Sequence, residues 1–329
     1  MKPNTCIESQ QPMFQMGHGE SPDWQAAAEQ CLQQMGYINP DANVGFLYVT
    51  DLYTDVTNTI LNHFKTETGV DHWVGTVGTG ICASGKEYYE TSAMSVMVGT
   101  FPEDSFRILP AMRKADDNPL STLQDWLRPD HSHFGIIHGD PSNDALPQMI
   151  SNLYETLPNG FLVGGLSSSR SDCPQIADDV SQGGLSGVLF SDQVPVITGL
   201  TQGCTPIGKK HVVSECEQNI VVGLDNRPAL DVFHDDIGEI LARDPERISG
   251  YIFIGLSVPG SDTSDYLVRN LVGMDAKQKL LAVGDILEQG QTIQFCRRDS
   301  STAWEDLLRM LNSLKQRLPG TPKGGVYYS

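Results

Sequence analysis

The sequence predicts an α/β protein with α+β character, in which two modules each hold mixed β-sheets covered by outer helices. Short apolar and β-branched runs alternate with longer amphipathic runs in both halves of the chain, which is the pattern of strands and helices packed in layers. A length of 329 residues suits two domains of about 100–200 residues each. A layered α-β-β-α arrangement is one architecture that this pattern allows.

In the first half, strands are predicted where apolar residues run between polar breaks, and helices where apolar residues recur with helical spacing. Ser21 and Pro22 are typical of a helix start, because a hydroxyl caps free N–H groups and proline fits the first turn. Asn118 is a similar cap further along the chain. The predicted helices are 22–35, 53–66, 119–127 and 143–157, and the predicted strands are 43–49, 73–77, 93–98 and 134–138.

The second half opens with a predicted hairpin, in which the polar break at 191–193 joins apolar runs at 186–190 and 194–201. The turn that follows, at 202–208, contains glycines and a proline that hold Cys204 on a defined loop. Beyond it the sequence predicts strands at 212–216, 219–223, 250–255, 280–284 and 291–296, and helices at 229–242 and 302–318.

Charge and hydropathy exclude several classes of function. The chain has 22 basic and 41 acidic residues, a net charge of −19, and this balance opposes binding to nucleic acid or to anionic membranes. The first 21 residues are polar, and no run of about 18 apolar residues occurs, so neither export nor membrane spanning is predicted. We therefore expect a cytoplasmic protein.

The cysteines favour reduced thiols. Their number is odd and they are widely scattered, which does not suit a disulfide framework, and no two have the spacing of zinc ligands. No metal site and no cofactor is predicted. The seven cysteines are at positions 6, 31, 82, 173, 204, 216 and 296.

Several segments, in order along the chain, resemble the FIST family, small-ligand sensory domains of bacteria. The glycine-rich segment 72–88 and the glycine turn at 161–168 resemble parts of the FIST N-terminal module. The block 183–233 carries the strands and turn described above, and 290–308 resembles the last strand and helix of the FIST C-terminal module. The resemblance covers residues 42–329 and implies a sensory domain that binds an amino acid or a related metabolite.

The resemblance also suggests a domain organisation. Residues 1–41 are expected to form an N-terminal extension, partly disordered with one helix, followed by a FIST N-like module at 42–226 and a FIST C-like module at 227–329. Free-standing bacterial members continue past a strand like 324–329 into a Cys-x-Gly-Arg-Gly segment. This sequence ends at Ser329, so the second module is expected to be incomplete.

The first candidate ligand-binding residues lie near the glycines of 75–85. This stretch lacks the endings of a phosphate loop and the spacing of a dinucleotide fingerprint, so its glycines instead indicate a close approach of backbone or ligand. Gly80 and Cys82 would face such a pocket, and Glu87 would receive a ligand amine. Alternatively, Cys82 is an ordinary core cysteine and Glu87 is a solvated carboxylate.

Further candidates follow two other predicted strands. His138 ends an apolar strand, where open α/β sheets place functional groups. Gly165, Ser167 and Ser168 offer amides and hydroxyls to a small anion or carboxylate, although an ordinary turn would look the same. Cys204 completes the predicted set. For Arg298, helix capping by its neighbours explains the sequence without a ligand.

Two alternative functions remain open. An acyl-transfer enzyme would need a cysteine activated by a histidine, such as Cys204 with His211 or Cys82 with His138, although no recognisable catalytic motif is present. Some FIST-like proteins are described as haem-binding nitric-oxide sensors, for which His63 and His138 would be the candidate ligands. The leading hypothesis is a non-enzymatic sensor that passes its signal to another polypeptide, with a homo-oligomer as one possibility.

Overall fold

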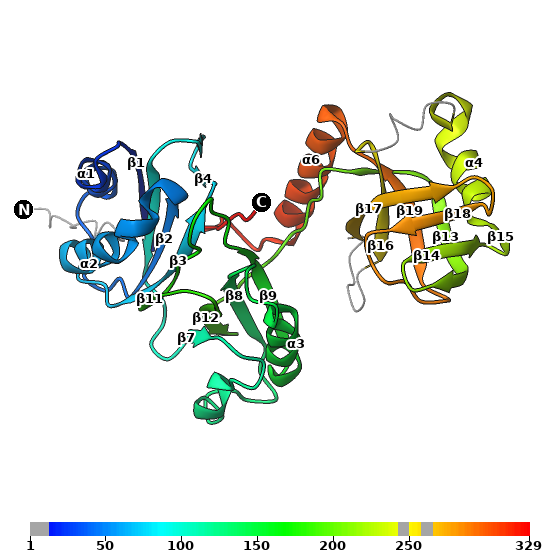
Figure 1. The fold of residues 1–329 in the computed structure, drawn as a ribbon. Coiled ribbons are helices and arrows are strands. Elements are labelled where there is room, and N and C mark those ends of the chain that lie inside the picture. The colour runs from blue at the N-terminus through cyan, green and yellow to red at the C-terminus, as the bar shows by residue number, and fades with distance from the viewer. Residues whose placement is uncertain (1–12, 243–249, 258–265) are drawn as a thin grey trace, which may run out of the picture. The chain divides into compact units, whose positions relative to one another are not determined.

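The computed structural model describes residues 13–242, 250–257 and 266–329, and the chain folds into two compact units (Figure 1). The first unit consists of Met1–Val196 together with Thr321–Ser329, and the second of Ile197–Gly320. The expected boundary at 226/227 lies inside the second unit. The reason is strand pairing, because the strand Thr205–Glu217 pairs with Thr292–Arg297, which lies on the C-terminal side of that boundary.

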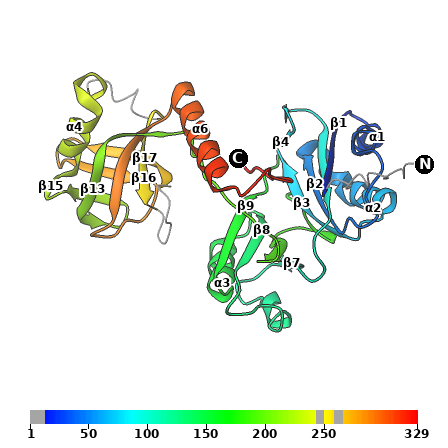
Figure 2. The ribbon, with the colours of Figure 1, turned by 180° about the vertical axis from the view of Figure 1, so that it is seen from behind.

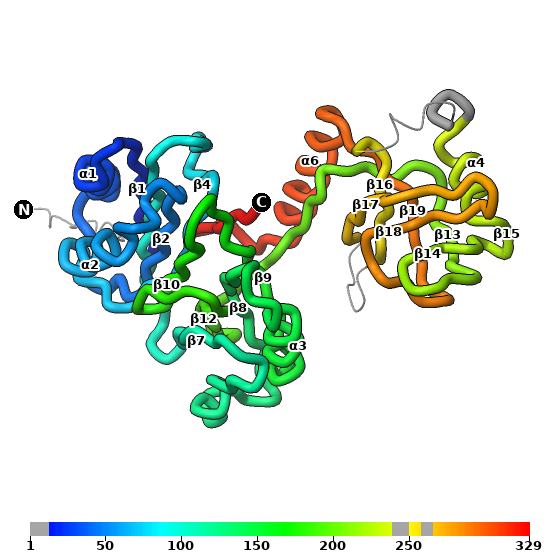
Figure 3. The backbone as a smooth tube through the Cα atoms, viewed as in Figure 1, coloured from blue at the N-terminus to red at the C-terminus, as the bar shows by residue number. Residues whose placement is uncertain are grey.

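The first sheet of the first unit has six strands and is covered by two helices. α1 (Trp24–Met35) and α2 (Thr57–Thr68) lie over one face, as the tube in Figure 3 shows, and bury a cluster that includes Cys31, Phe64 and Trp73. A 3₁₀ turn, η1 (Asp51–Val56), leads into α2. The strands, in order across the sheet, are β1 (Phe14–Glu20), β6 (Ala93–Gly99), β2 (Val44–Thr50), β3 (His72–Gly78), β10 (Gln175–Ala177) and β11 (Asp179–Ser181).

The second sheet has four strands and one covering helix. α3 (Leu146–Thr156) packs on one face with Leu146, Met149 and Leu153 against Ile137 and Leu189. In order across the sheet the strands are β7 (Phe106–Met112), β12 (Leu185–Ser191), β8 (His133–Gly139) and β9 (Gly160–Leu166). β8 and β9 run parallel, as β2 and β3 do in the first sheet.

The two sheets pack against each other through their remaining faces. Val44, Phe46 and Val74 of the first sheet share one buried cluster with Ile136 and Val188 of the second. Burial of such side chains stabilises the fold by about 1.5–3 kcal/mol each. The first unit is therefore a layered α-β-β-α sandwich, and the predicted fold class is confirmed.

The second unit is a small antiparallel barrel. β13 (Thr205–Glu217), β19 (Thr292–Arg297), β16 (Ile252–Ser257), β17 (Tyr266–Asp275), β18 (Leu280–Val283) and β14 (Ile220–Leu224) pair in that order. β13 also pairs with β14, which closes the sheet, and β15 (Arg227–Pro228) adds to the edge of β14. α4 (Ala229–Ala242) supplies Phe233 to the core beside Phe295, and α6 (Ser300–Arg317) completes the unit.

The N-terminal part differs from the expected extension. Residues 14–35 form β1 and α1, which are integral to the first sheet and its covering layer. β1 carries Gly17 and Gly19 where α1 lies against it. A Cβ atom at these positions would lie 2.2 Å from the carbonyl oxygen of Cys31 and 2.0 Å from that of Ala27. The strand is glycine-rich because the helix backbone packs directly on it.

Two predicted strands do not form. Residues 194–201 have no strand partner among the described residues, and the carbonyls of Thr198 and Leu200 instead accept hydrogen bonds from Arg317 and Arg309 of α6. Residues 324–329 are a tail without strand pairing, in which Gly324 lies against the ring of Phe14.

The predicted helix at 119–127 is also shorter in the structure. Only η2 (Pro119–Thr122) is helical, and a turn follows in which the Trp126 indole donates to the carbonyl of Asp104 at 2.7 Å. None of the helices in the described part of the chain is both long enough and apolar enough to span a membrane.

Candidate functional site

A row of polar side chains crosses the first sheet on the face that packs against the second sheet. Strand register aligns His18 with Ser95, Ser95 with Tyr48, Tyr48 with Thr76, and Thr76 with Gln175. Residues opposed in this way lie on the same face of a sheet. The row lies toward the carboxyl ends of the parallel strands β2 and β3.

The second sheet presents a shorter polar row to the same region. Ser186, His138 and Gly165 are opposed across β12, β8 and β9. The two rows meet where the Tyr48 hydroxyl lies 3.2 Å from Nε2 of His138. We call this set the inter-sheet polar layer; its members are His18, Tyr48, Thr76, Ser95, His138, Gly165, Ser167, Gln175, Ser186 and Tyr328.

The C-terminal tail contributes Tyr328 to this layer. Its hydroxyl lies 2.5 Å from the Tyr48 hydroxyl, and its ring stands edge-on to His138 with centroids 5.8 Å apart. The tail, red in Figures 1 and 2, ends beside the strands of the first unit in both views. A Cβ atom on Gly165 would lie 3.8 Å from the Tyr328 ring, so Tyr328 also covers this glycine.

The centre of the layer, formed by His138, Tyr48 and Tyr328, is uncharged at neutral pH. His138 is completely buried, and this burial lowers its pKa to about 4, so its imidazole is neutral. Burial also raises the pKa of Tyr48 and of Tyr328, so both hydroxyls keep their protons. The groups available are therefore neutral donors and acceptors.

Ser167 and Ser168 connect the end of β9 to the end of β3. The Ser167 hydroxyl lies 2.5 Å from that of Thr76, and its backbone N–H donates to Gly139 at 2.8 Å. The Ser168 hydroxyl accepts from the backbone N–H of Thr79 at 3.0 Å. The predicted residues His138, Gly165, Ser167 and Ser168 thus lie at one end of the sandwich.

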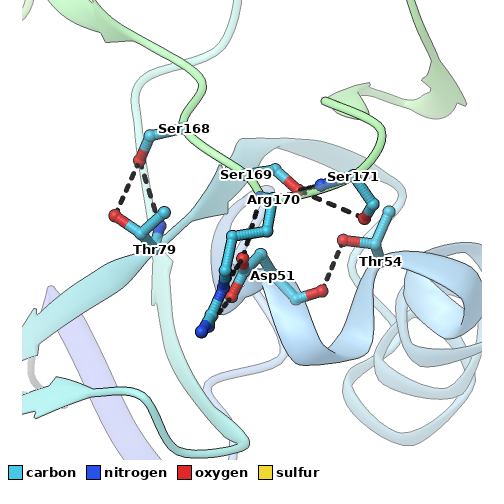
Figure 4. A network of polar contacts seen from close by, with 7 residues as sticks. All are labelled: Asp51, Thr54, Thr79, Ser168, Ser169, Arg170 and Ser171. Atoms are coloured by element: carbon cyan, nitrogen blue, oxygen red, sulfur yellow. Dashed lines mark hydrogen bonds and ion pairs between the residues drawn. The ribbon is translucent and has the colours of Figure 1, made fainter.

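The segment after Ser168 is held by an ion pair, drawn in Figure 4. Arg170 donates from Nε and Nη2 to the two carboxylate oxygens of Asp51, each at 2.8 Å, and from its backbone N–H at 3.0 Å. These bonds lower the pKa of Asp51, whose side chain is 2% exposed. The guanidinium itself is half exposed, so one carboxylate and one cation stand at the carboxyl ends of β2 and β9.

Three buried polar atoms of the layer are left without a partner. Within the described residues, Nδ1 of His138, Oγ of Ser186 and Oε1 of Gln175 have no hydrogen-bond partner. His138 and Ser186 are directly opposed on one face. An unpartnered buried polar atom is costly, by about 1–3 kcal/mol, so these three atoms leave hydrogen-bonding capacity of the layer unused.

The hairpin of β4 (Gly80–Ala83) and β5 (Lys86–Tyr89) carries the other predicted residues of the first unit. Ile81 and Tyr88 point inward, and the Tyr88 hydroxyl lies 2.6 Å from Nδ1 of His18. Cys82 is opposed to Glu87, and both side chains are exposed. Gly80 lies under the ring of Tyr89. The structure therefore does not bring Cys82 and Glu87 together with His138.

Cys204 belongs to the second unit and is fully buried. Its Sγ atom accepts from Nε of Arg298 at 3.3 Å, and Arg298 lies over the ring of Phe253 at 4.4 Å. Burial raises the pKa of Cys204 despite this cation. The proposed partner His211 uses both ring nitrogens on carboxylates, Asp225 and Asp236, each at 2.8 Å. The described contacts of His211 therefore do not activate the thiol of Cys204.

The surroundings of the candidate haem ligands do not fit a porphyrin. The His138 ring lies between those of Tyr48 and Tyr328, with centroids 5.6 and 5.8 Å away, and Nε2 already contacts a hydroxyl. His63 packs edge-on to Trp24 in the helical layer. Among the described residues there is also no group of three or more His, Cys, Asp or Glu side chains that could hold a metal ion.

Comparison with known protein families decides the relationship of this chain. The FIST N domain matches residues 43–227, and the FIST C domain matches residues 229–329. The chain belongs to the FIST family. The predicted resemblance is confirmed, and FIST domains are associated with sensing and signal transduction.

This FIST protein is similar to uncharacterized mycobacterial proteins. A protein of Mycobacterium tuberculosis strain H37Rv is 29% identical over 266 residues, which cover 78% of this chain and 68% of the relative. A Mycobacterium bovis protein is 28% identical over 202 residues, covering 58% of this chain and 51% of the relative. These similarities indicate no ligand.

Sequence reasoning missed several residues of the layer in the FIST N domain. Tyr48 and Thr76 were included in apolar strands, where a single polar side chain does not break the pattern. Gln175 lies on a strand of three residues, too short to be predicted. The signal that could have identified them is alternation, because Phe46 and Tyr48, like Val74 and Thr76, share one face of their strands.

Proposed function

We propose that this FIST protein is a non-enzymatic cytoplasmic sensor that binds a small polar metabolite, an amino acid or a close relative, in the inter-sheet polar layer. The observation that carries the proposal is the set of buried, unpartnered polar atoms on His138, Ser186 and Gln175. A ligand with an amide, amine or hydroxyl group would satisfy these atoms and recover their desolvation cost.

Position and charge support the same ligand class. The layer lies near the carboxyl ends of two pairs of parallel strands, where α/β proteins commonly bind ligands. At its edge stands the half-exposed guanidinium of Arg170, which is paired with the buried carboxylate of Asp51. An amino acid has a carboxylate group, which a guanidinium binds well.

The tail offers a route for the signal. Tyr328 covers His138 and Gly165, so a ligand that reaches His138 has to displace this ring. The tail continues α6 along the chain, with only a few residues between Arg317 and Thr321. Displacement of the tail would therefore be transmitted covalently to the second unit and would expose a new surface to a signalling partner.

The thiols support binding over acyl transfer. The six described cysteines are free, as expected in the cytoplasm. Burial raises the pKa of Cys204, and it raises those of Cys31 and Cys296 to about 12. Burial and the neighbouring Glu87 also raise the pKa of Cys82. A catalytic cysteine normally needs a lowered pKa.

A thermal-shift screen of free amino acids against matched serine variants tests this proposal. Ser186→Ala removes a hydroxyl of the layer, and Ser105→Ala removes another buried, unpartnered hydroxyl elsewhere in the same unit. We expect one ligand class to raise the Tm of the wild type and of Ser105→Ala, and to stabilise Ser186→Ala much less. Equal stabilisation of both variants would contradict the site. A Soret band in the purified protein would instead favour the haem alternative.

A further inference from the structure

A pocket of about 400 Å³ lies at the end of β8 and β12 opposite to His138. Its volume falls in the lower part of the range of small-molecule sites, about 300–1,000 Å³. We call it the His133 pocket. The lining residues that matter here are Arg107, Trp126, Arg128, His131, His133 and Ser191.

Two buried polar residues of this lining each have one atom without a hydrogen-bond partner. His133 is 2% exposed and Ser191 is 9% exposed, and the two residues are directly opposed on β8 and β12. Among the described residues, neither Nε2 of His133 nor Oγ of Ser191 has a hydrogen-bond partner. As in the inter-sheet layer, a histidine and a serine leave hydrogen-bonding capacity unused, but here both residues belong to the lining of a pocket.

The chemistry of His133 defines one ligand group. Its Nδ1 lies 3.1 Å from the carbonyl oxygen of Pro158, and a carbonyl can only accept, so Nδ1 is the donor in this contact. In the neutral ring, Nε2 then presents a lone pair. The ligand therefore has to donate a hydrogen bond to Nε2, while the Ser191 hydroxyl can either donate or accept.

Charges in the lining disfavour a strongly charged ligand. Arg107 forms an ion pair with Asp104 at 2.9 Å, and Nδ1 of His131 lies 2.8 Å from a carboxylate oxygen of Asp192. Asp125 and Arg128 also line the pocket, and their opposite charges balance each other. A phosphate would meet three carboxylates, and a cation would meet two guanidinium groups. Carboxylates and guanidinium groups bind hydroxyls well, as acceptors and donors respectively.

We propose that the His133 pocket binds a neutral polyhydroxylated small molecule, a sugar or a polyol. Its hydroxyls donate to Nε2 of His133, exchange hydrogen bonds with Ser191, and reach the charged groups of the rim. This site is separate from the inter-sheet polar layer and does not depend on the function proposed for that layer.

NMR titration of the full chain with glucose, galactose and myo-inositol tests the proposal. The probe is the indole N–H of Trp126, which lies in the lining and is assigned by its loss in Trp126→Phe. We expect a saturable shift with at least one of these probes. Ser191→Ala should weaken binding about tenfold by removing a hydrogen bond in the site, and His133→Phe should weaken it at least as much.

Control variants separate this site from the inter-sheet layer. Ser105→Ala is matched in burial but does not line the pocket, and Ser186→Ala lies in the other site. Both should bind the sugar like the wild type. The absence of any shift with the three probes, equal affinity in Ser191→Ala, or binding of inorganic phosphate at Trp126 in place of the sugars would each overturn the proposal.

Discussion

At the scale of single residues, His138 combines complete burial with a low pKa. Burial lowers its pKa to about 4 from an ordinary value of 6.5. The unfolded chain therefore binds a proton between these two pH values that the folded chain does not bind. By linkage, this histidine makes the free energy of unfolding rise with pH from about 4 to 6.5.

The first prediction concerns this pH dependence. A shift of this size corresponds to about 3 kcal/mol of stability, present above pH 6.5 and lost as the pH falls to about 4. His138→Phe removes the titrating group, so we expect its stability to fall less steeply than that of the wild type over this interval. Urea denaturation at a series of pH values checks this. Parallel curves for the two proteins would contradict the buried, neutral histidine.

The second prediction concerns Asp51. Hydrogen bonds from Arg170 lower its pKa, so Asp51→Asn removes the charge that anchors the chain after Ser168. We expect amide hydrogen exchange at Arg170 and Ser171 to become at least several-fold faster. Mass spectrometry of the exchanged peptides measures this, with Asp179→Asn, an exposed carboxylate in the same unit, as the control. Unchanged exchange would mean that other contacts hold the loop.

At the scale of elements, the close approach of α1 to β1 gives the third prediction. A methyl group at Gly19 would lie 2.0 Å from a backbone oxygen of α1, so the helix has to move. We expect Gly19→Ala to lower the free energy of unfolding by about 1–3 kcal/mol. Gly320→Ala adds a methyl group in open space and serves as the control. Equal midpoints in urea would refute direct backbone packing.

The elements predicted correctly are those that pack through the apolar side chains visible in the sequence pattern. The helical segment Ala229–Ala242 was predicted with its outer bounds because its apolar face fills the barrel core, but the kink at Gly238, where φ is +76°, was not predicted. β1 was missed because it has glycines where the backbone of α1 packs on it, and glycines give no hydrophobic signal. The run at 194–201 was predicted to be a strand because it is rich in β-branched residues. In the structure its carbonyls instead accept hydrogen bonds from arginine side chains of α6, a tertiary effect that local patterning does not contain.

The candidate site was predictable only in part, for a related reason. His138 and Ser167 lie at strand ends and were found by position, whereas Tyr48 and Tyr328, whose rings contact His138, are 280 residues apart in the sequence. Only the register of the two sheets and the path of the tail bring these residues together. The predicted ligand roles of Gly80, Cys82, Glu87 and Cys204 stay predictions, and the described contacts do not link them to the layer.

At the scale of the whole molecule, the tail gives the fourth prediction. Tyr328 is anchored in the layer, whereas its neighbour Tyr327 is 57% exposed. Tyr328→Ala should free the tail and speed tryptic cleavage after the exposed Lys323, with loss of residues 324–329 detected by mass spectrometry. Tyr327→Ala should behave like the wild type. Equal cleavage rates in the two variants would show that Tyr328 does not hold the tail.

The most direct test of the central claim is the ¹⁵N NMR spectrum of the His138 imidazole during titration with the amino acid that gives the largest thermal shift. If the ligand binds in the inter-sheet polar layer, the Nδ1 resonance of His138 should move with saturation, because this atom gains a hydrogen-bond partner. His72, exposed on β3, should not respond. A ligand that stabilises the protein while the His138 resonances stay fixed would contradict the proposed site.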